Sequence, residues 1–393
     1  MGLPKLEGVT GKVMLLSLAI FFADASHSTV IPIFPSFAQK IGASLSMLGS
    51  YGSVSAVAML LFSLPFGRLS DRFGRKVMMI PGLLIFIMVP LFYIVSSSPY
   101  HLYPIRALLG LGMGLVFSNG FLLMTEIADP ANLSTAQGMY MTFMGMGFTI
   151  GPLLGGLTAN FYEPKISFLL SSFFALLSII IILFVRSRFE KRESQGRVRV
   201  GLIVKDPRIL AAGVANYVNV LMFNALTFFF PVYGERIGLN EAEIGIGFTA
   251  RGVASTAVRL PVGSFTRRFR VLNLMLVGLL LSSLTILSIS WSSGLILVSI
   301  LLGLQGIAYG IYLTSGHIYI ALNSREDYRG TAMAVYSMFG NVSGIINPLI
   351  LGLIAEVIGT KGALQFSAGM TLFGLILVYF MASKNISTDE FTK

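Results

Sequence analysis

Twelve long apolar stretches run through this sequence of 393 residues, and they limit its possible folds more than any other feature. Each is long enough to cross a bilayer as a helix, which takes about 20 residues. They lack the alternation of apolar and polar residues that a membrane-spanning β-strand requires, so helices are predicted. The predicted spans are 13–37, 45–66, 77–97, 100–124, 135–161, 166–186, 208–234, 242–264, 271–291, 294–321, 330–356 and 362–382.

The composition also indicates a membrane protein. Hydrophobic residues make up 55% of the chain, and the mean hydropathy is +0.81. A soluble protein of this length could not bury so much apolar surface, whereas lipid accepts it. The chain has no Cys, which excludes disulfides and Cys-based metal sites. The sequence contains no Walker loop and no metal-site spacing of His, Asp and Glu, so we expect neither an enzyme nor an ATP-driven pump, and no cofactor.

Positive charge gathers on one side of the predicted spans. If both termini are cytoplasmic, the outer side holds four of the 28 Lys and Arg residues and the interior of the spans holds three. The cytoplasmic side, with Arg186 and Arg208 at span ends, holds the other 21. The outer four are Lys40, Lys165, Arg236 and Lys361, and the three in spans are Arg106, Arg251 and Arg259. This asymmetry follows the positive-inside rule. The net charge of +11 therefore sets topology in a multi-pass cell-membrane protein, and nucleic acid is not an expected partner.

The two halves of the chain match each other at a constant offset of 196 positions. The pairs include Pro35 with Pro231, Gly42 with Gly238, Gly110 with Gly306, Tyr140 with Tyr336 and Pro152 with Pro348. Each half holds six spans, so both halves enter the membrane from the same side and the repeats are parallel. Such repeats are typical of transporters whose halves rock about a central cavity. We predict an N-terminal bundle, 1–186, a cytoplasmic linker, 187–207, and a C-terminal bundle, 208–393.

A charged segment, GRLSDRFGRK at 67–76, joins the second and third spans. Gly67 and Gly74 are expected to permit a tight turn, and Arg72 and Arg75 to hold the segment in the cytoplasm. The segment resembles the signature loop of the major facilitator superfamily, and the span count and the repeat extend the resemblance over essentially the whole chain. It implies an all-α membrane protein of twelve transmembrane helices in two parallel-repeat six-helix bundles. It also implies transport by alternating access, and we expect the chain to act as a monomer.

Asp71 is the acid of this inner-gate loop. It can accept hydrogen bonds from the N-terminus of the eleventh span, near Arg329, where the helix dipole favours a carboxylate. The family resemblance implies the same contact, a latch between the two halves. The matching loop of the second half has Arg267 and Arg270 in place of Asp71 and Gly74, so one latch is predicted. The alternative is that the bases of the loop only set topology.

The fifth span is rich in glycine. Gly138, Gly147, Gly151, Pro152, Gly155 and Gly156 fit the pattern G-x8-G-x3-G-P-x2-G-G. This pattern resembles the motif of the drug/proton antiporter branch of the superfamily. Glycines at these spacings line one helix face and let a neighbouring helix approach closely, and the proline is expected to kink the span. Ordinary packing of small residues is the alternative interpretation.

Three ionisable residues lie deep in the predicted spans of the first half. Asp24 is about 16 Å into the first span by helical rise, and His27 follows on the same face. Arg106 in the fourth span is predicted at nearly the same depth. Such charges are costly in hydrocarbon and mark functional sites. If Arg106 keeps Asp24 ionised, separation of the two residues favours the protonated acid, whereas a cationic substrate beside Asp24 favours the ionised form. A permanent Asp24–Arg106 pair and a bystander role for His27 remain alternatives.

Polar and aromatic residues of the second half are predicted to line the other wall of the substrate cavity. Together with Asp24 these candidates are Asn216, Asn219, Phe223, Arg251, Gln305, Tyr309, Tyr336 and Asn341. Each one alone is more often found in helix packing. The leading functional hypothesis is a proton-coupled efflux antiporter of lipophilic or cationic small molecules. The alternatives are a carrier for a defined metabolite, sugar or lipid-linked anion, and a membrane sensor that does not transport.

Overall fold

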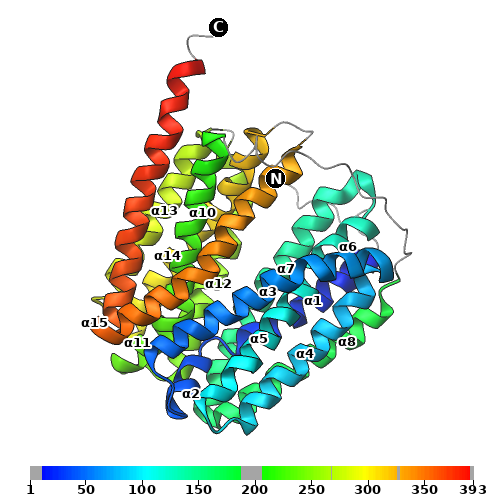
Figure 1. The fold of residues 1–393 in the computed structure, drawn as a ribbon, viewed down its shortest axis with the longest axis vertical. Coiled ribbons are helices and arrows are strands. Elements are labelled where there is room, and N and C mark those ends of the chain that lie inside the picture. Colours follow the sequence, from blue (N-terminus) through cyan, green and yellow to red (C-terminus); the bar gives the residue numbers. More distant parts are fainter. Residues whose placement is uncertain (1–10, 187–205, 267, 325–327, 390–393) are drawn as a thin grey trace. The chain divides into compact units, whose positions relative to one another are not determined.

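The computed structural model describes residues 11–186, 206–266, 268–324 and 328–389, and this part of the chain consists of helices and their connections, with no strand. In the first half the helices are α1 (Gly11–Thr29), α2 (Phe34–Lys40), α3 (Leu45–Phe73), α4 (Arg75–Val95), α5 (Leu102–Met113), α6 (Asn119–Ile127), α7 (Leu133–Phe161) and α8 (Pro164–Phe184) (Figure 1). In the second half they are α10 (Pro207–Asn224), α11 (Phe230–Arg236), α12 (Glu241–Phe265), α13 (Val271–Ile289), α14 (Leu295–Leu322) and α15 (Arg329–Asp389).

Several predicted spans are built from more than one helix. The first is α1 followed by α2, and the seventh is α10 and α11 joined by a π-helical turn, η4 (Ala225–Phe229). Both interruptions precede a proline, Pro35 or Pro231, at the start of the second piece. A proline ring clashes with the carbonyl four residues earlier and offers no N–H, so the helix changes geometry there. The fourth span is α5 and α6 joined by the π-helical turn η2 (Gly114–Ser118).

The last two predicted spans share α15, which is interrupted at Gly359. This glycine has φ 78°, a left-handed backbone conformation that ends one helix before the next begins. Among the described residues nine stretches are long and apolar enough to cross a membrane, and the last of them, Arg329–Ala382, covers both of these spans. The helices α7 and α12 are also long enough, but glycines in α7 and charged residues in α12 lower their hydropathy.

The chain divides into two compact units. Unit 1 comprises Met1–Gly42 and Val54–Glu193, and unit 2 comprises Ala43–Ser53 and Ser194–Lys393. The first turns of α3 thus belong to unit 2, where a Cβ on Gly49 would lie 2.0 Å from the carbonyl oxygen of Pro348. Most of the predicted linker, 187–207, lies outside the described residues, as does Arg267, so the predicted domain division stays a prediction.

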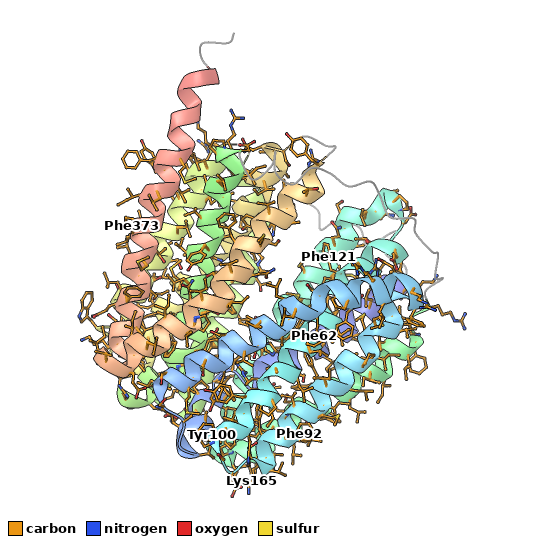
Figure 2. All side chains as sticks on the ribbon, viewed as in Figure 1. Phe62, Phe92, Tyr100, Phe121, Lys165 and Phe373 are labelled. Carbon is orange, nitrogen blue, oxygen red and sulfur yellow. The ribbon has the colours of Figure 1, made fainter. Side chains whose placement is uncertain are left out.

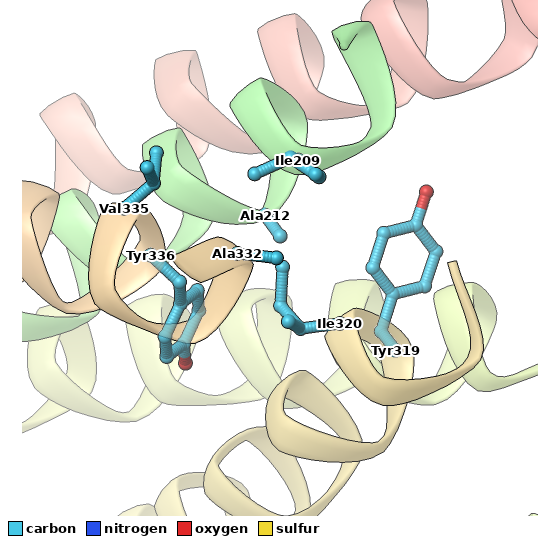
Figure 3. Close-up of a cluster of buried hydrophobic side chains, with 7 residues drawn as sticks. All are labelled: Ile209, Ala212, Tyr319, Ile320, Ala332, Val335 and Tyr336. Carbon is cyan, nitrogen blue, oxygen red and sulfur yellow. The ribbon is translucent and has the colours of Figure 1, made fainter. Parts of the chain in front are cut away.

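Within unit 1, α1 packs against α7 and α8, and α4 packs against α5 and α8. Within unit 2, α10 packs against α15, and α14 packs against α12 and α13. One buried cluster of unit 2 joins Ile209 and Ala212 of α10, Tyr319 and Ile320 of α14, and Ala332, Val335 and Tyr336 of α15 (Figure 3). Large apolar side chains such as Phe62 and Phe373 project from their helices and are exposed, as expected of surfaces that face lipid (Figure 2).

The sequence repeat is also a repeat of contacts. A Cβ on Gly110 would meet the carbonyl oxygen of Ser55 at 1.9 Å, and a Cβ on Gly306 would meet that of Arg251 at 2.1 Å. Both members of the second pair lie 196 positions after those of the first. The same offset relates the contact of Gly120 with the Tyr140 hydroxyl to that of Gly316 with the Tyr336 hydroxyl. The two units therefore use the same helix-packing scheme.

Candidate functional site

The glycines of α7 bring this helix into backbone contact with α1. A Cβ on Gly147 would lie 2.4 Å from the carbonyl oxygen of Phe21, and one on Gly155 would lie 2.1 Å from that of Thr29. Between them, a Cβ on Gly151 would lie 2.1 Å from the hydroxyl of Ser28. These distances leave no room for a side chain, so the helices can only meet this closely with glycine.

The other three residues of the glycine motif, Gly138, Pro152 and Gly156, differ from these in their surroundings. A Cβ on Gly138 would have nothing within 4 Å, so this glycine is not needed for the contact. Gly156 is buried, and Pro152 lies inside α7, which continues past it to Phe161. The α1–α7 contact therefore rests on Gly147, Gly151 and Gly155.

Asp24 lies on α1 beside this contact and is 5% exposed. A Cβ on Gly147 would touch the Cβ of Asp24 at 3.1 Å, so the missing side chain of Gly147 makes room for the acid. The carboxylate is close enough to the phenol of Tyr140 on α7 for electrostatic interaction. Ser28, one turn further along α1, donates to the carbonyl oxygens of Asp24 (2.7 Å) and of Gly147 (3.1 Å). The acid is therefore held at the junction of α1 and α7.

Arg106 comes from α5 and is 7% exposed. Its guanidinium lies 4.3 Å from the centroid of the Phe34 ring, a cation–π contact. The charge also interacts with the imidazole of His27 and with the phenol of Tyr93. The His27 ring stacks on Phe86 with centroids 6.2 Å apart, and its Nδ1 has no hydrogen-bond partner among the described residues.

The interior of unit 1 thus holds all three predicted proton-coupling residues. Asp24 and His27 are contributed by α1 and Arg106 by α5. Tyr140 was not among the predicted site residues, although the repeat pairs it with Tyr336, which was. A direct Asp24–Arg106 pair stays a prediction.

Six of the eight candidate cavity residues of unit 2 fall into two groups. Asn216 donates from Nδ2 to the carbonyl oxygen of Tyr336 at 3.0 Å, and the hydroxyls of Tyr336 and Tyr312 lie 3.2 Å apart. These side chains join α10, α14 and α15 to one another. Asn219 is buried, and Asn341 is exposed.

The other group surrounds Arg251 of α12, which is 1% exposed. Its Nε donates to Oε1 of Gln305, whose Nε2 donates to the hydroxyl of Ser282 at 2.9 Å. The rings of Phe223 and Tyr309 lie 5.2 and 5.0 Å from the guanidinium carbon. Four predicted residues therefore form one cluster. Ser282 was missed, because a single serine in an apolar span carries no distinguishing signal.

The predicted inner-gate loop is shorter than expected. Gly67 was expected in a tight turn, but α3 continues through it to Phe73, and a Cβ on Gly67 would have nothing within 4 Å. Gly74 alone separates α3 from α4, with φ 96°. Hydropathy indicates where a span leaves lipid, but a helix can continue into water when its residues are good helix formers.

The basic side chains of this segment contact other residues of unit 1. Arg75 donates to Asp71 and to Ser70, and its Nε lies 3.4 Å from Oε1 of Glu126 on α6. The side chain of Asp71 is 54% exposed. Arg72 lies over the ring of Phe73. The predicted latch between Asp71 and the start of α15 stays a prediction.

Known proteins resemble this chain over most of its length. The family model described as Major Facilitator Superfamily matches residues 16–242 and 212–390. The chain is 25% identical over 374 residues to multidrug resistance protein MdtG of Salmonella arizonae, which covers 91% of this chain and 92% of that protein. MdtG of Escherichia coli O6:K15:H31 is also 25% identical, with 91% of each chain covered.

Solved structures share the fold. The nucleoside transporter NupG superposes with a TM-score of 0.81 at 12% identity, covering 94% of this chain and 100% of that one. A bacterial homolog of the human lysosomal transporter Spinster superposes with a TM-score of 0.78 at 14% identity, covering 96% and 97%. These likenesses confirm the predicted all-α membrane fold of twelve helices. Since the family model spans nearly all of it, the chain belongs to the Major Facilitator Superfamily, whose members are membrane carriers and not enzymes.

Proposed function

We propose that this protein is a proton-coupled secondary transporter that exports lipophilic or cationic small molecules by alternating access. The observation that carries the proposal is Asp24, a carboxylate buried beside the glycine contact of α1 and α7. On insertion scales an acid near the middle of a span costs about 2.5–3.5 kcal/mol, so a residue of this kind is a functional candidate.

The surroundings of Asp24 fit proton exchange. Tyr140 lies close to the acid, and a second charge, Arg106, lies in the interior of the same unit. A cation that binds near Asp24 stabilises its ionised form and displaces the proton, whereas protonation removes the attraction for the cation. Competition between proton and cargo for one carboxylate gives antiport when the carrier changes its access only with one of the two bound.

The antiporter-like glycines and the relatives support the direction of transport. Gly147, Gly151 and Gly155 all take part in the α1–α7 contact, which places the motif beside the proposed coupling residue. The relatives at 25% identity are multidrug resistance proteins by name. We propose a cell-membrane location with both termini cytoplasmic, and a monomer as the working unit. A carrier for one metabolite, sugar or lipid-linked anion is the alternative.

Transport in proteoliposomes tests the proposal. Vesicles that are acidic inside, with potassium and valinomycin clamping the voltage, should accumulate radiolabelled tetraphenylphosphonium as protons leave. Asp24→Asn should reduce this accumulation to the level of protein-free vesicles, because an amide cannot exchange a proton. Asp129→Asn is a matched control, since Asp129 is exposed and caps a short turn by accepting from the N–H of Ala131, which Asn can also do.

The alternative function, a carrier for one metabolite, sugar or lipid-linked anion, predicts the opposite result in this assay. A metabolite carrier would leave tetraphenylphosphonium uptake independent of the pH gradient and would accept one member of a sugar and metabolite panel. Cation uptake that ignores the gradient in the unmodified protein, or that survives Asp24→Asn, would contradict the proposal.

A further inference from the structure

Arg251 is a buried charge for which the proposed antiport has no use. It lies in the middle of α12, is 1% exposed, and is the largest of the fully buried side chains in the described part of the chain. Its Nε is satisfied by Gln305, but its Nη2 is buried with no hydrogen-bond partner among the described residues. A buried donor that has no acceptor destabilises the folded protein, and more so on a charged group, so its presence needs a reason.

No acid in the described part of unit 2 forms an ion pair with Arg251. In 206–266, 268–324 and 328–382, the carboxylates are Asp206, Glu235, Glu241, Glu243 and Glu356, all close to the ends of helices. Glu243, on the same helix, precedes Arg251 by eight residues, or about 12 Å of helical rise. Arg259, the next arginine on α12, adds a positive charge that acts on Arg251. The interior of unit 2 thus carries excess positive charge, in contrast to unit 1 with Asp24 and Arg106.

Two aromatic rings cover the guanidinium in place of an acid. The centroids of Phe223 and Tyr309 lie 5.2 and 5.0 Å from its central carbon and 6.1 Å from each other. These three distances form a nearly equilateral triangle, so both rings lie on one side of the charge. Each ring stabilises the cation, but a ring face cannot accept a hydrogen bond as strongly as a carboxylate. The cation is therefore only partly stabilised.

The rings are also the more accessible part of the cluster. Phe223 and Tyr309 are half-buried, whereas Arg251, Gln305 and Ser282 are buried. Gln305, itself bonded to Ser282, fixes the guanidinium through Nε and leaves Nη2 for another partner. This is the arrangement of an anion site with a fixed cation and a removable aromatic cover.

We propose that Arg251 is the recognition group of an anion site in unit 2, which binds the carboxylate of an aromatic organic acid when Phe223 and Tyr309 swing aside. Nη2 donates to the carboxylate, and the two rings pack on the aromatic body of the ligand. The site goes beyond cation export by adding a class of ligand. It depends on residues of unit 2 and requires no proton exchange at Asp24.

Binding of a matched pair of probes tests this site in the purified, full-length protein in lipid nanodiscs. Tritiated naphthalene-2-carboxylate and naphthalene-2-carboxamide share a ring system and differ in charge. The carboxylate should bind about tenfold more tightly than the carboxamide, the expected value of a charged hydrogen bond. Arg251→Gln should remove this preference by weakening the carboxylate alone, and Arg251→Lys should keep part of it because the charge remains.

A second arginine on the same helix is the control. Arg259→Gln removes one positive charge two turns further along α12, so it should weaken carboxylate binding about twofold or less through the screened field. Phe223→Ala opens the aromatic cover and should speed carboxylate association about threefold, the value of one lost cation–π contact. A melting curve shows whether Arg251→Gln folds. If it does not, Phe223→Ala still tests the site, because this variant keeps Arg251.

Several outcomes would overturn the site. Equal affinity of the unmodified protein for both probes would do so, as would equal losses in the Arg251→Gln and Arg259→Gln variants or slower association after Phe223→Ala. Asp24→Asn should leave carboxylate binding unchanged. Failure of the anion site and failure of the proposed antiport would therefore appear in different experiments.

Discussion

The contact of α1 with α7 in unit 1 and that of α10 with α15 in unit 2 occupy the same repeat positions but use different chemistry. In unit 1 the backbone of Gly147 meets the carbonyl oxygen of Phe21. In unit 2, 196 positions later, the hydroxyl of Ser343 donates to the carbonyl oxygen of Tyr217 at 2.6 Å. The first contact rests mainly on the absence of side chains, with a hydrogen bond from the Ser28 hydroxyl to the carbonyl oxygen of Gly147, whereas the second rests on directional bonds.

The hydrogen bonds of unit 2 extend further along the helices. Asn347, at the position of Gly151, donates to Ser343 at 2.6 Å and accepts from the hydroxyl of Tyr217 at 3.0 Å. A hydrogen bond fixes the register of two helices. Asn216, Tyr217 and Ser343 make such bonds between α10 and α15. Ser28 makes one between α1 and α7. We infer that α1 and α7, which flank Asp24, can slide past each other at lower cost than α10 and α15. The acid would thus lie on the pair of helices that is easier to move.

The largest test of this difference fills the glycine contact. Gly151→Val would force a side chain into space occupied by the Ser28 hydroxyl and the Ala25 carbonyl oxygen, 2.1 and 2.7 Å from its Cβ. Overpacking of this kind costs about 3 kcal/mol, so the variant should melt well below the unmodified protein and lose proton-driven transport. Gly138→Val, in the same motif but with nothing within 4 Å, should melt normally. Equal effects of the two substitutions would contradict the proposed role of the contact.

A second difference between the halves lies in the connection between the second and third spans of each half. Gly74 has φ 96° and ψ 146°, a conformation that is essentially confined to glycine, whereas Arg270 at the matching position has φ −58°. Gly74→Ala should therefore cost about 2 kcal/mol of stability. Gly67→Ala, in open helical surroundings, should instead stabilise by about 0.5–1 kcal/mol. Thermal melting of both variants checks whether these two glycines of one motif have opposite effects.

The sequence predicted the spans well and the breaks within them poorly. Hydropathy reports where lipid surrounds a helix, so the twelve spans could be located. It could not show that α3 continues to Phe73, because charged residues are compatible with helix outside lipid. The π-helical turn at Gly114–Ser118 was also unexpected, since no proline marks it and glycines such as Gly114 are common in membrane helices.

The candidate site was likewise predicted only in part. The burial of Asp24 and Arg251 could be predicted, because a lone charge in an apolar run has to lie inside the protein. Their partners could not, since Tyr140 and Ser282 resemble many other residues of their spans. Asn216 was predicted in the cavity wall, but its amide donates to the backbone of Tyr336. The neighbour that a polar residue of a helix contacts depends on how the helices pack. This packing cannot be read from a single sequence.

The smallest test removes the directional bond from unit 2. Ser343→Ala keeps the small size of the side chain but deletes its bonds to the Tyr217 carbonyl oxygen and to Asn347. The expected loss is about 1–2 kcal/mol, since each of the two hydrogen bonds contributes roughly 0.5–1 kcal/mol net, and it is therefore below that of Gly151→Val. Amide hydrogen exchange should accelerate in α10 and α15 while α1 and α7 exchange as before. If α10 kept its protection after the substitution, the register of that pair would be fixed by packing alone, and the contrast between the two units would lose its chemical basis.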